Sequence, residues 1–298
     1  MTARPSAAVH GAGADRWIRL VDGRRLGFAE YGDPAGIPAF MFHGVPGSRL
    51  SLGGAGEPDP AGRRLRAIAP DRPGIGLSDP QPGRTILSWP RDVAALANAL
   101  GIDRFGVFGG SAGGVYALAC AFALPERVGR VVVVNTPAPM AWPGVWRGHP
   151  LSARAAWQGI ARVPGLARFV AGFQRQAALR GPTLVRLLGR RMAPEDRALL
   201  ASREVSDQLV RHFREAYRQG SAGVADDLRL IARPWGFRPH AVTVPVDLWQ
   251  GLRDRNVPPA MGRALAEALP HCRAHFVAAE GHLASEQYGA IRAVLLDG

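Results

Sequence analysis

Short apolar runs alternate along this chain with longer stretches in which apolar residues recur every three or four positions. The short runs predict strands, and the periodic stretches predict helices between several of them. Because strands alternate with helices, we expect an α/β fold with a mostly parallel sheet and helices on both of its faces. The eight predicted strands are Trp17–Leu20, Leu26–Tyr31, Ala39–Phe42, Arg66–Ala69, Arg104–Phe108, Arg130–Val134, Val244–Gln250 and Arg273–Val277. The clearest predicted helices are Ser88–Leu100, Ala112–Leu124, Pro258–Leu269 and Ala284–Leu296.

The alternation of strands and helices stops in the middle of the chain. Amphipathic segments without convincing strands take its place there, among them Ala153–Ala161, Thr183–Arg191 and Val205–Gln219. The segment from Pro137 to His240 holds 17 arginines against 7 acidic residues. We therefore expect a core made of residues 1–136 and 240–298, with a helical insertion of residues 137–239 that emerges after the sixth strand and caps the core.

Four glycines surround one serine in the stretch Gly109-Gly110-Ser111-Ala112-Gly113-Gly114. The stretch follows a buried-strand pattern and precedes a helix pattern, which is the context that a G-x-S-x-G nucleophile turn requires. Side chains at positions 109 and 113 would collide in so sharp a turn, so Gly109 and Gly113 are needed for structural reasons. Ser111 would then be exposed at the carboxyl edge of the sheet, above the N-terminus of a helix that favours developing negative charge.

A serine hydroxyl is a poor nucleophile unless a base activates it and a third group orients that base. Asp254 lies on the loop after one predicted strand, and His282 lies on the loop after the next. One α/β step brings both loops to the edge where Ser111 is expected, in the chain order Ser, Asp, His. We therefore predict Ser111, Asp254 and His282 as catalytic residues. The competing acid and histidine candidates lie within strands or carry no titratable charge: Asp247, His271, His275 and Asn135.

Acyl transfer also needs hydrogen-bond donors for the negatively charged oxygen of the tetrahedral intermediate. A glycine-rich turn, His43-Gly44-Val45-Pro46-Gly47, follows the strand Ala39–Phe42. We predict that the backbone N–H groups of Val45 and Ala112 form this oxyanion hole. His43 and Gly44 are expected to shape the loop rather than to take part in the reaction.

Taken together, four motifs resemble those of the α/β-hydrolase superfamily. They are His43–Gly47, Asp71–Ser78, Gly109–Gly113 and the paired loops that carry Asp254 and Gly281-His282. The resemblance runs from about Trp17 to the end of the chain, and it implies an eight-stranded sheet with a helical cap after the sixth strand. It further implies a serine hydrolase that cleaves an ester-like bond through an acyl-enzyme. Dehalogenases and epoxide hydrolases of this superfamily use an aspartate nucleophile, and Ser111 argues against both.

Four other functions remain open on the sequence alone. Perhydrolases and carbon–carbon bond hydrolases of the superfamily both keep the serine nucleophile. The stretches GGSAGG and HGVPG are also similar to proline iminopeptidases, although those usually read HGGPG and carry tryptophan after the nucleophile, where this chain has Val45 and Ala112. A protein of this fold could also bind a small ligand without turnover, but such proteins often lack part of the catalytic set.

Composition adds limits to this picture. The formal charge is +13, but all 37 basic residues are arginine, as in proteins of GC-rich genomes, so we do not expect nucleic-acid binding. Apolar runs are shorter than the roughly 20 residues of a membrane span, and residues 1–16 should form a frayed tail without a secretory signal. Cys120 and Cys272 lack metal-ligand spacing. We expect a cytoplasmic protein with a small-molecule substrate, no cofactor or metal, no membrane partner, and a homodimer as one allowed assembly.

Overall fold

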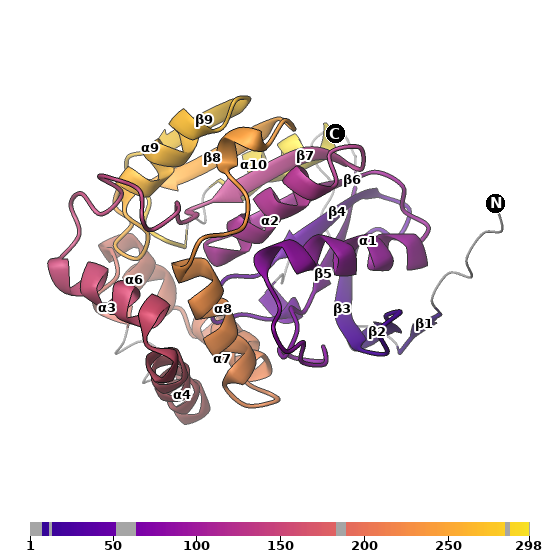
Figure 1. Cartoon of the computed structure of the whole chain (residues 1–298), viewed down its shortest axis with the longest axis horizontal. Helices are drawn as coiled ribbons and strands as arrows, with labels where there is room; N and C mark the ends of the chain where they lie inside the picture. The colour runs from indigo at the N-terminus through magenta and orange to yellow at the C-terminus, as the bar shows by residue number, and fades with distance from the viewer. Residues whose placement is uncertain (1–7, 12–13, 52–63, 183–188, 284–286, 298) are drawn as a thin grey trace.

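One nine-stranded sheet forms the centre of the computed structural model, with strand order β1-β2-β3-β5-β4-β6-β7-β8-β9 (Figure 1). The structure describes residues 8–11, 14–51, 64–182, 189–283 and 287–297. The strands are β1 Val9–His10, β2 Arg16–Arg19, β3 Arg25–Gly32, β4 Ile37–Phe42, β5 Leu65–Pro70, β6 Phe105–Gly110, β7 Val128–Val134, β8 Val246–Gly251 and β9 Cys272–Val277. Strands β1, β2, β3 and β5 pair antiparallel in that order, whereas β5, β4, β6, β7, β8 and β9 pair parallel. The mostly parallel sheet predicted from the sequence is confirmed.

Helices cover both faces of this sheet. They are α1 Trp89–Ala99, α2 Ala112–Ala123, α9 Pro259–Ala268 and α10 Tyr288–Leu296. Helices α1, α2 and α9 pack with one face in a large apolar cluster, and α10 packs on the other face in a second cluster. Within β4, Phe40 and Phe42 belong to the first cluster, and Ala39 and Met41 belong to the second. Because side chains alternate across a strand and both faces are covered, the strand reads as a continuous apolar run.

Two expectations about the N-terminal region need correction. The sheet has nine strands rather than eight, because Val9 and His10 pair with Ile18 and Trp17 of β2. Part of the expected frayed tail is therefore a short edge strand. The ring of His10 stacks on that of Trp17 with 4.2 Å between their centroids, a contact that adds to the backbone pairing.

Two predicted segments lie partly outside the described residues. The predicted helix Ala284–Leu296 corresponds to α10, and residues 284–286 are not described. Of the amphipathic segment Thr183–Arg191, residues 183–188 are not described. No helix in the part of the chain that the structure describes is both long and apolar enough to cross a membrane.

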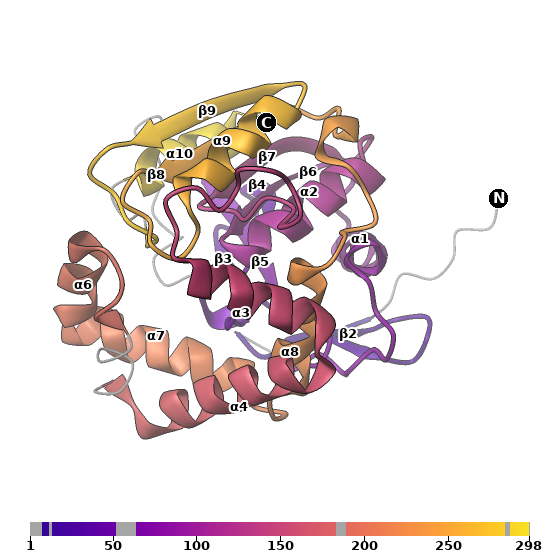
Figure 2. The same ribbon diagram turned by 60° about the vertical axis from the view of Figure 1, so that its left-hand side comes forward.

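Helices form the segment between β7 and β8 that we call the cap. Within its described residues they are α3 Leu151–Arg162, α4 Pro164–Arg180, α6 Pro194–Ala201, α7 Arg203–Ala216 and α8 Ala222–Ala232, and they lie together on one side of the molecule (Figure 2). Small and aliphatic side chains of α4 and α8 pack in a third apolar cluster, which also contains Ile75 of the core and touches Val45. The cap is thus seated on the loops that follow β4 and β5.

Candidate active site

Ser111 lies at the turn between β6 and α2 with φ 53° and ψ −128°. A positive φ is unusual for a residue with a Cβ atom and stores backbone strain. The turn is anchored because the Ser111 N–H donates to the Val134 carbonyl at 2.8 Å and its carbonyl accepts from the Gly114 N–H at 3.1 Å. The first N–H groups of a helix have no partner within the helix, so the start of α2 presents positive partial charge beside Ser111.

Close backbone approach explains the glycines on either side of this serine. A Cβ atom at Gly109 would lie 2.3 Å from the carbonyl carbon of Gly113, and one at Gly113 would lie 2.0 Å from the Phe42 carbonyl oxygen. Neither contact is sterically possible. Only glycine at these two positions therefore allows strand β6, helix α2 and the end of β4 to approach each other this closely.

The loops after β8 and β9 join Asp254 to His282. Nδ1 of His282 lies 2.8 Å from Oδ2 of Asp254, whose side chain is fully buried. The other oxygen, Oδ1, accepts the N–H groups of Asn256 at 2.7 Å and Val257 at 2.9 Å. These bonds fix the carboxylate, so it can hold the imidazole in one orientation and favour the tautomer with the proton on Nδ1.

Among the described residues, Ser111 and His282 are not joined by a hydrogen bond. Ser111 follows β6 and His282 follows β9, with β7 and β8 between these strands in the sheet, and catalytic hydrogen bonds are often long before substrate is bound. The acid and the base predicted from the sequence are thus in contact, while the contact between base and nucleophile is left to the liganded state.

The pKa of His282 predicts an acid limb in the rate profile. Burial alone would lower this pKa, but the charges of Asp254 and Asp196 and the hydrogen bond to Asp254 outweigh it and raise it above 6.5. A general base must be neutral, so activity falls as the pH falls through this pKa. We expect kcat/KM for an uncharged ester to rise through an apparent pKa above 6.5. A limb at or below 6.5, measured with enzyme shown to be stable at each pH, would contradict this.

Asn135, a residue that the sequence does not favour as the acid, connects the loop that carries Asp254 with the loop that carries His282. It follows β7 with φ 49°. Its Nδ2 donates to the carbonyls of Gly281 at 3.1 Å and His282 at 2.8 Å, and its Oδ1 accepts the Gly251 N–H at 2.8 Å. One amide side chain thereby ties the loop that carries His282 to the loop that leads to Asp254.

Asp196 of cap helix α6 is a site residue that sequence reasoning missed. Its side chain is buried and accepts the backbone N–H groups of His282 at 3.0 Å and Leu283 at 2.8 Å. A Cβ atom at Gly281 would lie 2.3 Å from its carboxylate, so the glycine before the histidine makes room for it. Nothing in the sequence pairs positions 86 residues apart, and Asp196 reads locally as an ordinary acid in the first turn of a helix.

Replacing Asp196 with alanine should therefore loosen the histidine loop. Two buried N–H groups would lose their acceptor, and a misplaced base typically costs about 10- to 100-fold in kcat. Loss of the negative charge should also move the acid limb of the pH profile to lower pH. Glu195→Ala is the matched control, because Glu195 sits one position earlier and pairs with exposed Arg253 rather than with the histidine loop. Equal rate losses in both variants would argue against a positioning role.

The predicted oxyanion loop lies against the serine. A Cβ atom at Gly44 would be 3.5 Å from Cβ of Ser111. His43 is buried, with Nδ1 2.9 Å from the Gly44 carbonyl and Nε2 accepting the Arg72 N–H at 3.4 Å. Burial and the Arg72 guanidinium hold the pKa of His43 well below 6.5, so the ring is neutral. The His43 ring thus contributes hydrogen bonds within this loop and carries no charge.

Arg72 binds two carbonyl groups of this loop. Its place in the motif Asp71–Ser78 did not predict this role. Its guanidinium donates to the His43 carbonyl at 2.6 Å, the Gly44 carbonyl at 2.9 Å and Asp227 of α8 at 2.8 Å. Arg84 also pairs with Asp227, at 2.7 Å. Burial alone would raise the pKa of Asp227, but the two arginines hold it at about 2. A fully buried charge cluster thus links the cap to the predicted oxyanion loop.

The cap aromatics do not gather around the serine as a pocket lining. Trp142 and Trp146 pack against the main core cluster and Trp235 is buried within it, while Trp157 packs in the cap cluster. Two phenylalanines of α4 point to solvent instead, Phe169 and Phe173.

Within the described residues, no group of three or more histidine, cysteine, aspartate or glutamate side chains is arranged to hold a metal ion.

Similarity to known proteins shows the family to which this fold belongs. A family profile of the alpha/beta hydrolase fold matches residues 39–287. The chain is 36% identical over 117 residues to a proline iminopeptidase of Xylella fastidiosa (strain 9a5c), covering 38% of this chain and 36% of that protein. It is 37% identical over 120 residues to a 2-hydroxymuconate semialdehyde hydrolase of Pseudomonas putida, covering 39% and 42%. The match therefore spans less than half the length of each of these curated relatives.

A solved structure agrees over nearly the whole chain. The structure of a hydrolase from Pseudomonas aeruginosa PA01 is similar with a TM-score of 0.66 at 18% identity, covering 97% of this chain and 100% of that chain. At this identity the likeness concerns the fold alone. The resemblance inferred from the four sequence motifs is confirmed by the profile, which extends from β4 to the start of the last helix. The chain belongs to the α/β-hydrolase fold family.

Proposed function

We propose that this protein is a serine hydrolase that cleaves an ester bond of a small molecule through an acyl-enzyme. The observation that carries the proposal is the pair formed by His282 and Asp254, 2.8 Å apart, at the same sheet edge as the strained turn of Ser111. Such a turn persists only where the surrounding structure enforces it, and strain of this kind is concentrated at functional sites. An oriented imidazole at the same sheet edge as a half-buried serine supplies the base and the nucleophile that such catalysis needs.

The proposed reaction has two stages. Oγ of Ser111 attacks the ester carbonyl, His282 takes the hydroxyl proton on Nε2, and the negative charge collects on the carbonyl oxygen, facing the N–H groups of Val45 and Ala112. The alkoxide leaves with the proton from His282, and the acyl group stays on Ser111. Water then attacks the acyl-enzyme with His282 again as base. Asp254 stays ionised throughout and holds Nδ1–H of the imidazole.

An ester is the simplest substrate class for this set of residues, because an alkoxide leaves more readily than an unprotonated amide nitrogen or a carbanion. Release of an amino-terminal proline would in addition require a carboxylate to bind the substrate's ammonium group. The buried carboxylates of the described cap are already engaged, Asp196 by backbone N–H groups and Asp227 by two arginines. This supports an ester over a peptide.

Aminopeptidase and carbon–carbon hydrolase activities are the second candidates. Both are favoured by one observation, the identity of 36% and 37% to a proline iminopeptidase and to 2-hydroxymuconate semialdehyde hydrolase. A carbon–carbon hydrolase would use the same serine and histidine on a vinylogous diketone. The third candidate is a ligand-binding protein without turnover.

One experiment separates these candidates. The chain is treated with a small fluorophosphonate and its intact mass is measured, and kcat/KM is then determined for p-nitrophenyl butyrate, proline p-nitroanilide and a vinylogous 1,5-diketone. We expect one adduct per chain, located on Ser111, and the highest kcat/KM for the ester. A higher value for the anilide or the diketone would replace the ester proposal with the corresponding candidate. A folded chain that neither reacts nor turns over any of the three would support the binding protein.

A further inference from the structure

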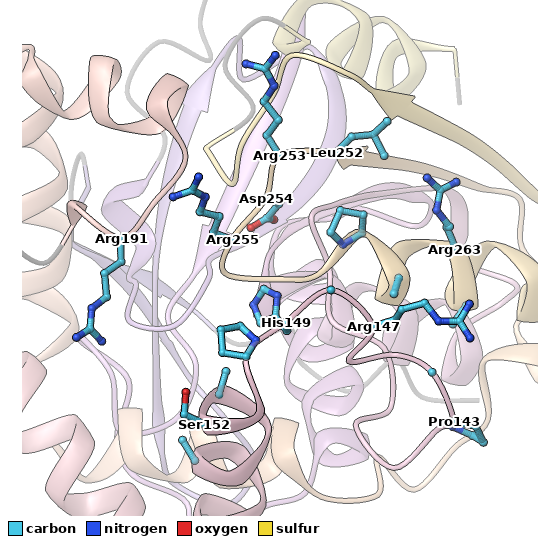
Figure 3. Close-up of a pocket in the computed structure, with 18 of the residues that line it drawn as sticks. Pro143, Arg147, His149, Ser152, Arg191, Leu252, Arg253, Asp254, Arg255 and Arg263 are labelled. Atoms are coloured by element: carbon cyan, nitrogen blue, oxygen red, sulfur yellow. The ribbon is translucent and has the colours of Figure 1, made fainter.

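A cavity of about 1800 Å³ opens beside the acid of the proposed triad (Figure 3). It is lined by the loop 143–150 and the start of α3, by residues 190–194, and by the loop 252–255 and α9. Asp254 is part of the lining, but Ser111 and His282 are not. This arginine cavity, as we call it, is therefore a space next to the candidate active site, and the proposed hydrolysis does not account for it.

The charge of the lining is strongly one-sided. Six arginines line the cavity against two acidic residues: Arg147, Arg190, Arg191, Arg253, Arg255 and Arg263 against Asp254 and Glu267. The carboxylate of Asp254 is buried and already accepts hydrogen bonds from His282 and from the backbone N–H groups of Asn256 and Val257. Arg253 pairs with Glu195. Within the described part of the chain the other five arginines form no ion pair with an acid.

The arginines are arranged on two sides of the space. Arg147 and Arg263 lie on one side, and Arg191 and Arg255 lie on the opposite side (Figure 3). These arginines are exposed at the cavity, so their guanidinium groups are accessible to an anion from solvent, and salt screens their repulsion of one another. Such pairs are favourable when an anion lies between them, because a guanidinium binds a phosphate or carboxylate with two parallel hydrogen bonds.

Two helices add positive potential to the same space. Pro150, Ser152 and Ala153 line the cavity at the start of α3, and Pro259 and Ala260 line it at the start of α9. Both helices begin without a capping side chain and without an acidic residue in the first turn. The N–H groups of Ala153 and Met261 bind the carbonyls of Pro150 and Pro258, so what the two helices add here is the positive ends of their dipoles. This supports the charge argument, which rests on the arginines.

We propose that the arginine cavity binds a small molecule that carries at least two phosphate groups. Two arginine pairs on opposite sides match two separated anionic groups better than one. The volume is larger than the 300–1,000 Å³ or so of most ligand sites, so an organic part can accompany the phosphates. Phosphate is favoured over carboxylate because it offers more oxygens and more charge to each guanidinium. This inference does not depend on the proposed catalytic role of Ser111.

The test is calorimetric titration of the full chain at low salt with three probes: inorganic phosphate, pyrophosphate and adenosine diphosphate. We expect pyrophosphate to bind at least about tenfold more tightly than phosphate, and the binding to weaken as salt is added. If adenosine diphosphate binds more tightly still, the cavity takes an organic diphosphate. If the two bind equally, the diphosphate group alone is recognised. A folded chain that binds neither would overturn the proposal.

Matched variants locate the binding. Arg147→Gln/Arg263→Gln and Arg191→Gln/Arg255→Gln should each weaken pyrophosphate binding about tenfold or more. The control is Arg154→Gln/Arg168→Gln, which removes the same charge from α3 and α4 outside the cavity and should change the affinity less than about twofold. Equal losses in the control would mean general attraction to a basic protein and would overturn the site. Ser111→Ala should bind pyrophosphate like the unmodified chain, which keeps this test separate from that of the hydrolase.

Discussion

Replacing Ser111 with alanine should lower kcat/KM for p-nitrophenyl butyrate by about 10⁵-fold or more. Loss of the nucleophile removes the covalent route entirely, and only the hydrogen-bond donors and substrate binding are left to act on attack by water. The fluorophosphonate adduct should disappear in the same variant. The fold should survive, because the substitution removes one oxygen atom and keeps the Cβ atom that the turn already accommodates.

A second substitution at this position checks the strain on which the site assignment rests. Ser111→Gly should be equally inactive, but its free energy of unfolding should be higher than that of Ser111→Ala by about 1 kcal/mol. Relief of about 1–3 kcal/mol of strain at φ 53° exceeds the roughly 0.5–1 kcal/mol that glycine costs in conformational entropy. Chemical denaturation of both variants measures the difference. Residual activity within tenfold of the unmodified chain in either variant would remove Ser111 from the mechanism.

Arg72→Met should lower kcat by about 10²- to 10³-fold with a smaller effect on KM. The reason lies in the geometry of one peptide unit. The carbonyl of Gly44 and the N–H of Val45 belong to the same planar trans peptide and point in opposite directions. Arg72 binds the Gly44 carbonyl at 2.9 Å, which turns the Val45 N–H away from Arg72. Without this bond only Nδ1 of His43 still holds the Gly44 carbonyl, at 2.9 Å, so the proposed donor is held less firmly, and loss of one oxyanion donor costs about this much in kcat.

Stability changes must be separated from this positioning effect. Arg72→Met also leaves Asp227 with one arginine instead of two, and breaking a buried ion pair costs about 3–5 kcal/mol. Arg84→Met is the matched control, since Arg84 binds the same carboxylate at 2.7 Å but donates to Gly223 rather than to the oxyanion loop. We expect both variants to lose stability and only Arg72→Met to lose kcat strongly. Similar kcat losses at a temperature where both are folded would assign the effect to cap packing.

Local patterns were sufficient for most of the fold. The eight longer strands and helices α1, α2, α9 and α10 correspond to segments predicted from hydrophobic periodicity, because each buries an apolar face whose period is visible in a few residues. The short β1 strand was not predicted. Two residues show no period, and their pairing with β2 depends on a partner that local sequence does not specify.

The candidate site likewise combines residues that the sequence predicts with residues that it does not. Ser111, Asp254 and His282 stand out because each follows a strand in the order that one sheet edge can bring together, and their proposed roles await the experiments above. The sequence did not predict the supporting role of Arg72, Asn135 and Asp196, although Asn135 is among the rejected acid candidates and Arg72 lies in the motif Asp71–Ser78. Each binds backbone groups of segments that lie 28 to 147 residues away. Such contacts leave no periodic trace, since a backbone carbonyl or N–H is present at every position.

Local sequence patterns establish the order of strands and helices, the serine turn between β6 and α2, and the types of side chain available at the sheet edge. Tertiary contacts then determine which polar groups support this edge and which have no charged partner. Asp196 accepts backbone N–H groups of the histidine loop and Asp227 pairs with Arg72, whereas five arginines around one cavity form no ion pair with an acid among the described residues. The number of charged residues can be read from the chain. Which charges compensate each other depends on the fold, because electrostatic energy depends on the distance between groups and on their burial.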